Sequence, residues 1–187
     1  MPDQSSISAA AQDSGEGVVF AVRDHAGPLR RLFIVLIDVA FVYACGICVL
    51  VVFLDRIELH SVIRNLWLLF AVRYFTLLKS TPLGSLGLML AGCRIITLKG
   101  KRPSFPRMTL RLFLWIWGPF NPLFDLIWLC GDERRQSIRD RLMGTYVVRK
   151  SAKPIGRGKL RWAQLFYWGM SLGFEEVQPP RIVQPAA

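Results

Sequence analysis

The chain has 187 residues, with 24 Lys or Arg against 13 Asp or Glu, a net charge of +11 and a mean hydropathy of +0.35. A soluble domain this basic would suggest a nucleic-acid partner, but no stretch has the signature of a nucleic-acid-binding fold. Because the chain also has long apolar runs, we expect its basic residues to lie in loops that face the anionic headgroups of a lipid bilayer. No metal-ligand spacing, phosphate-binding loop or Ser/His/Asp set is found, so we expect no enzyme, no catalytic residue, no cofactor and no metal.

Composition divides the chain into three parts. Residues 1–15 are rich in Ser, Ala and Asp and are expected to be a disordered tail. Residues 16–150 hold all the long apolar runs and form the predicted transmembrane domain. Residues 151–187 form a C-terminal extension. Near the start of the domain, Gly17–Val22 is β-branched and aromatic and predicts a short strand.

The run Leu32–Leu54 is almost wholly apolar and long enough, at ~1.5 Å per residue, to cross the ~30 Å hydrocarbon core of a bilayer. It contains one acid, Asp38. An acid at a helix centre costs about 2.5–3.5 kcal/mol, and sixteen Leu, Ile, Phe or Val residues return roughly 7 kcal/mol, so the helix still inserts. An acid inside a membrane span is a candidate functional residue, and a structural ion pair is the alternative.

The second apolar run, Val62–Leu78, contains Arg73 and predicts a second transmembrane helix. If the N-terminus is cytoplasmic, Asp38 and Arg73 lie at similar depths below the cytoplasmic face, counted at helical rise. We therefore predict that Asp38 and Arg73 form an ion pair, with Arg111 as the rival partner.

Two strands and a short helix are expected near the membrane surface. Leu83–Ala91 predicts a helix that lies at the interface. Cys93–Leu98 predicts a strand, and Thr145–Val148 can pair with it only if both lie on the same side of the membrane.

The third apolar run, Leu110–Cys130, is broken by the sequence Gly118-Pro-Phe-Asn-Pro122. Each half has about eight residues and covers ~12 Å, less than half of the hydrocarbon core. A kinked single span and a re-entrant hairpin are both open. The segments on either side are strongly basic, and the positive-inside rule places both in the cytoplasm, so we favour the hairpin. Asp125 lies just past the break and is a third charged candidate within the apolar runs.

The C-terminal extension contains Arg161–Phe174, which is rich in aromatic residues but too short to span a bilayer. We expect an interfacial amphipathic helix or a surface that docks a partner. The predicted fold is therefore an all-α multi-pass membrane protein with two full transmembrane helices, a broken third segment and a small cytoplasmic sheet.

Three blocks of sequence resemble the RDD family of small multi-pass membrane proteins. They are Ala26–Asp38, Leu83–Ser104 with Arg111, and Arg134–Val148. In this resemblance Arg31 matches the family's arginine, Asp38 its first aspartate and Asp140 its second. Two positions depart from the pattern: Arg139 replaces a common His or Gly, and Ile34 replaces a common small residue. From the residues alone, Asp140 could cap a helix or pair with a neighbouring arginine (Arg135, Arg139 or Arg141).

The resemblance implies an integral protein of the cell (inner) membrane, and for some members it suggests cation/proton antiport. An intramembrane carboxylate such as Asp38 can bind protons or cations. One copy is too small to enclose a route, so a transporter would be a homo-oligomer. The other reading is a membrane scaffold or assembly factor that holds an unknown membrane partner, with Asp38 serving only to pair helices.

Overall fold

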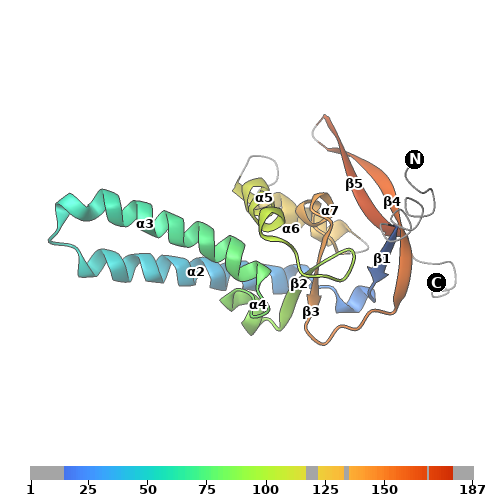
Figure 1. Cartoon of the computed structure of the whole chain (residues 1–187), viewed down its shortest axis with the longest axis horizontal. Coiled ribbons are helices and arrows are strands. Elements are labelled where there is room, and N and C mark those ends of the chain that lie inside the picture. Colours follow the sequence, from blue (N-terminus) through green and yellow to red (C-terminus); the bar gives the residue numbers. More distant parts are fainter. Residues whose placement is uncertain (1–14, 117–121, 133–134, 168, 179–187) are drawn as a thin grey trace, which may run out of the picture.

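The computed structural model describes residues 15–116, 122–132, 135–167 and 169–178 (Figure 1). Two long helices lie side by side and project as a hairpin from the rest of the molecule. The first helix is α2 (Pro28–Val52). The second is α3 (His60–Arg73), which continues as a π-helical turn, η3 (Tyr74–Leu78). Two short 3₁₀ turns, η1 (Val22–Asp24) and η2 (Ile57–Leu59), precede them.

The hairpin has the properties of two membrane spans. Pro28–Val52 and His60–Leu78 have mean hydropathies of 2.7 and 1.3, and only 17% and 11% of each apolar window is buried. Large apolar side chains such as Leu36 and Leu66 instead lie about 60% exposed. A helix in the core of a soluble protein buries its apolar surface, so this exposure supports the two predicted transmembrane helices as candidate spans.

The third apolar run folds as two short helices, α5 (Phe105–Ile116) and α6 (Pro122–Gly131). The strands on either side of this segment, β2 (Cys93–Thr97) and β3 (Thr145–Arg149), pair in antiparallel register from Cys93↔Arg149 to Thr97↔Thr145. The predicted strand pair is therefore confirmed, and the two ends of the third run lie at the same end of the molecule, as the hairpin reading requires. Residues 117–121, which hold most of the predicted break, lie outside the described residues.

A second sheet has the strand order β1-β4-β5. Its strands are β1 (Glu16–Val19), β4 (Gly156–Tyr167) and β5 (Met170–Gln178). The first of these is the strand expected near Gly17. With 23% of the described residues in strands, the description as all-α is too narrow: the fold combines a helical hairpin with two small sheets.

The expected amphipathic helix at Arg161–Phe174 is wrong, because these residues form most of the β4–β5 hairpin. Burial alternates along Ala163 to Phe166, the two-residue period of a strand. A two-residue connection joins Tyr167 to Met170, and within it Gly169 has φ +76°, a conformation that hairpin turns require and glycine adopts freely. Of the predicted tail, all but Gly15 lies outside the described residues.

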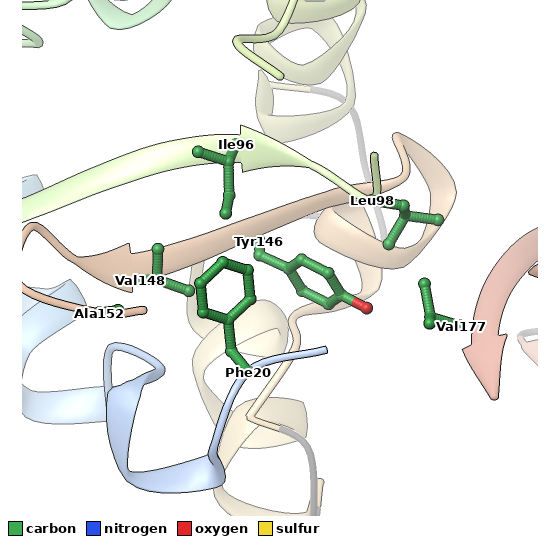
Figure 2. Packing of buried hydrophobic residues seen from close by; sticks show 7 residues of the cluster. All are labelled: Phe20, Ile96, Leu98, Tyr146, Val148, Ala152 and Val177. Atoms are coloured by element: carbon green, nitrogen blue, oxygen red, sulfur yellow. The ribbon is translucent and has the colours of Figure 1, made fainter. Parts of the chain in front are cut away.

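Two apolar clusters join these parts. The first connects the two sheets, and Figure 2 shows Phe20 and Tyr146 at its centre with Val177 of β5 at its edge. The second cluster packs the base of α2 against the β2–β3 pair. Its members are Ala26, Ile34, Leu88, Cys93, Ile95, Met108 and Val147. Two short helices remain: α4 (Leu86–Leu90), which contributes Leu88 to the second cluster, and α7 (Ile138–Leu142), which carries Arg139, Asp140 and Arg141.

Candidate functional site

Asp38 lies at the centre of a closed network of donors. Its side chain is 0% exposed. Oδ1 accepts hydrogen bonds from the Tyr74 hydroxyl at 2.9 Å and the Gly87 N–H at 2.7 Å, and Oδ2 accepts one from the Ser85 hydroxyl at 2.7 Å. The Lys79 ammonium lies 3.0 Å from Oδ2. Both carboxylate oxygens therefore have partners, and the charge is balanced by one cation.

The cation beside Asp38 is Lys79, so the predicted Asp38–Arg73 pair is wrong; Arg73 is exposed on α3. The cause is the π-helical turn that follows α3. A π turn closes hydrogen bonds between residues five apart, which places such residues one above the other on the same face. Tyr74 and Lys79 are five apart at the two ends of this turn, and both reach Asp38. The prediction of Arg73 counted depth at the rise of a regular α-helix and did not allow for the π turn.

Asp38 also fixes the short helix α4 against α2. Ser85 is the N-cap residue of α4, and its hydroxyl donates to Asp38. The Gly87 N–H, one of the first-turn groups that have no partner within a helix, donates to the same carboxylate. A Cβ at Gly87 would overlap the Ile34 carbonyl oxygen and lie 2.8 Å from Asp38 Oδ1, so this approach of α4 to α2 requires glycine.

Asp140 forms a second buried node, at the start of α2. It is 0% exposed and is paired with two arginines, Arg31 and Arg111, the latter at 2.5 Å from Oδ1. Thr145 of β3 donates a third hydrogen bond at 3.3 Å. Arg31 also donates to the carbonyl oxygens of Ala26 and Arg135. The node therefore joins α2, α5, α7 and β3, and Arg111, the rival expected for Asp38, belongs to it.

The field around Asp140 favours its ionised form. Burial by itself would raise the pKa of this carboxyl group. Arg111 and then Arg31 lower it by more, so that the pKa of Asp140 lies well below its usual value. The expected neighbours Arg135, Arg139 and Arg141 are not its ion-pair partners in the described structure. The Asp140 N–H donates a hydrogen bond to the hydroxyl of Ser137, which is the N-cap residue of α7.

Two more pairs surround these nodes. Asp125, the candidate in α6, is buried and accepts a 2.5 Å hydrogen bond from Nε of Arg139. Asp132 pairs with Arg141. The sequence-predicted residues thus separate into Arg31, Arg111 and Asp140 in one node, Asp38 in another and Asp125 in a third, while Arg73 joins none of them.

Sequence reasoning missed Tyr74, Lys79, Ser85 and Gly87 as partners of Asp38, and Arg139 as the partner of Asp125. Lys79 directly follows the second apolar run, where a snorkelling cation is common, but nothing in its position separates it from the other basic residues. The Ser85-Leu86-Gly87 sequence carries a weak signal for a helix start, because serine is a preferred N-cap.

Asn at position 140 would leave two buried arginines without their counter-charge. We expect Asp140→Asn to lower the free energy of unfolding by about 3–5 kcal/mol, the usual cost of breaking a buried ion pair. Glu16→Gln is the control, because the Glu16–Arg157 pair is exposed and such pairs contribute about 0–1 kcal/mol. Thermal or denaturant unfolding of the detergent-purified chain measures both. Equal effects of the two substitutions would contradict the described role of Asp140.

The buried imidazole of His25 should make the free energy of unfolding depend on pH. It is buried against Phe20 and Tyr146, and burial, with a smaller effect of Arg31, lowers the pKa of this imidazole to about 4. In the unfolded chain its pKa is about 6.5, so between these values the unfolded state binds more protons. The contribution of neutral His25 to stability is complete above about pH 6.5. It is lost as the pH falls toward 4, and the loss reaches roughly 2 kcal/mol at about pH 5. Unfolding curves of wild type and His25→Phe against pH test this; an unchanged slope in the variant would contradict it.

One of the comparisons with known proteins gives a match. The family model described as "RDD family" matches residues 25–144, a range that contains Arg31, Asp38 and Asp140. No curated protein and no solved structure matches the chain. Because the family model covers more than half of the sequence, the chain belongs to the RDD family, a family of membrane proteins.

Proposed function

We propose that the protein is a multi-pass protein of the cell (inner) membrane, with the α2–α3 hairpin across the bilayer and both sheets and the N-terminus in the cytoplasm. The exposed apolar surface of the hairpin supports the crossing. The ten Lys or Arg against three acids in Gly131–Arg161 support the cytoplasmic side for the opposite end of the molecule. The link between the helices, near Glu58, would then face the other side.

Accessibility of single cysteines tests this topology. In a background without Cys45, Cys48, Cys93 and Cys130, we expect Lys99→Cys and Lys159→Cys to react with an impermeant thiol reagent only when the cytoplasmic side is open. Glu58→Cys should react from the outside in intact cells. All three positions are exposed. Labelling of Lys99→Cys and Lys159→Cys from opposite sides would reject the hairpin arrangement of the third apolar run.

Within the membrane we propose a scaffold or assembly role, in which the hairpin anchors the cytoplasmic sheets and these hold a partner. The observation that carries this proposal is the closed environment of Asp38: two oxygens, three hydrogen-bond donors and one ammonium group, with no exposure. A carboxylate that binds and releases ions needs a free coordination position, and this one is used to join α2, η3 and α4.

The β4–β5 hairpin is the surface that we assign to the partner. Trp162 and Phe166 on β4 are 65% and 76% exposed, and exposed aromatic side chains of this size mark interaction sites on other proteins. Because this segment is a pair of strands and not a helix, we propose that it binds the partner protein as a stiff two-stranded arm.

A transporter of a small ion or solute is the second candidate. It is favoured by one observation: Lys79, the partner of Asp38, also lines a cavity of about 80 Å³. A homo-oligomer would supply the remaining walls of the route. In this reading the Asp38–Lys79 pair would open and close during transport.

Loss of a partner tests the scaffold role. We expect the double variant Trp162→Ser with Phe166→Ser to lose a co-purifying partner while the chain remains folded in the membrane, because two large exposed aromatic side chains of β4 are removed. Ile155→Ser is the control: Ile155 is also apolar and 51% exposed, but it lies just before β4. Affinity purification of the three chains from membranes, with the bound proteins quantified, measures the effect.

Ion flux in proteoliposomes tests the second candidate on the same fold. A transporter is expected to show flux that falls in Asp38→Asn and in Lys79→Gln, because each substitution breaks the Asp38–Lys79 pair. Flux that depends on Asp38, with no partner lost in the aromatic double variant, would overturn the scaffold proposal.

A further inference from the structure

Four cations surround one cavity at the base of the hairpin. The cavity has a volume of about 80 Å³, roughly five times what one water molecule needs. Its charged lining residues are Arg31, Lys79, Arg111 and Arg139. Each comes from a different element: α2, the residue after η3, α5 and α7. The acids that pair with them, Asp38, Asp125 and Asp140, do not line this cavity, so the charge presented to it is positive.

The ion pairs leave one positive charge unbalanced. Among the described residues of this cluster, four cations are matched by three carboxylates, because Arg31 and Arg111 share Asp140. Four positive and three negative charges leave +1. An uncompensated charge withdrawn from water is costly, and a monoanion in the cavity would balance it.

Arg111 supplies an unused donor at this place. Its side chain is 9% exposed, and Nη2 contacts Asp140. Its other terminal nitrogen, Nη1, is buried and has no hydrogen-bond partner among the described residues. Buried donors in proteins are almost always paired, and the cavity that Arg111 lines is the space that could hold an acceptor.

The other wall of the cavity is apolar and aromatic. Phe75 and Trp115 pack with ring centroids 5.8 Å apart, and Lys79 and Arg139 lie over these rings at 5.0 and 6.0 Å. Val35 and Leu112 complete this side. The site therefore presents cations to an anionic head and apolar groups to whatever is attached to it.

We propose that this cavity binds a phosphate group of net charge −1, held by Arg111 and Arg139, with an apolar substituent against Phe75 and Trp115. The phosphodiester of an anionic lipid at the end of the transmembrane hairpin has this chemistry, and free inorganic phosphate shares the head alone. Arginine binds phosphate through paired N–H groups, which suits the free Nη1. The site goes beyond the proposed function, since it requires neither a protein partner nor transport.

Arg139 and Arg141 provide a matched pair of variants. Both lie on α7, both pair with an aspartate, and their side chains are 15% and 16% exposed, but only Arg139 lines the cavity. We expect Arg139→Gln to weaken binding of short-chain phosphatidylglycerol to the detergent-purified full chain about tenfold, as loss of a charged hydrogen-bond donor does. Arg141→Gln should leave it unchanged, and Arg139→Lys should restore part of it. Native mass spectrometry of a lipid titration gives these affinities.

A steric pair tests the site without a change of charge. Val35→Phe would fill the cavity, whereas the neighbouring Leu36, 59% exposed, does not line it. We expect Val35→Phe to prevent the binding of phosphatidylglycerol. The Leu36→Phe variant should bind this lipid as tightly as the wild type does. Thermal stabilisation by phosphatidylglycerol but not inorganic phosphate identifies a lipid as the source; stabilisation by inorganic phosphate with the same dependence on variants identifies free phosphate. Binding that is equal in Arg139→Gln and Arg141→Gln, or absent for both probes in the wild type, would overturn the proposal.

Discussion

Complete withdrawal of two carboxylates from water constrains the whole base of the hairpin. Asp38 and Asp140 are each 0% exposed, and an unpaired charge at such a position costs several kcal/mol. Each acid is paired with cations from segments far from it in the sequence: Asp38 with Lys79, and Asp140 with Arg31 and Arg111. The α2–α3 hairpin and the elements at its base therefore cannot be placed independently, because each supplies counter-charges that the other needs.

Local signals were enough to predict most elements. The length of the apolar runs predicted both long helices, and β-branched patterns predicted β1, β2 and β3, because these signals depend on neighbouring residues in the sequence. The β4–β5 hairpin was missed for a related reason. A short stretch rich in aromatic residues is compatible with both an amphipathic helix and a strand, and the turn at Gly169 was not used to distinguish them.

The partners of the buried acids depended on features that local signals do not carry. Arg31 was selected by its resemblance to the family arginine, yet its contact with Asp140 spans 109 residues. The choice of Arg73 for Asp38 rested on a uniform α-helical rise through the second span. The π turn changes which residues share a face, and it makes Lys79, at the polar end of the span, the residue that reaches Asp38.

The position of Lys79 has a consequence for how the hairpin sits in a bilayer. A cation near the centre of a span is costly to insert, whereas one at its end keeps its head in the polar region. With Lys79 neutralising Asp38 from that end, the acid is paired without a basic residue in the middle of the hydrocarbon layer. The same end carries Arg31, Arg111 and Arg139. Charge pairing that stabilises the fold and an excess of positive charge are therefore supplied by one cluster, at the base of the hairpin.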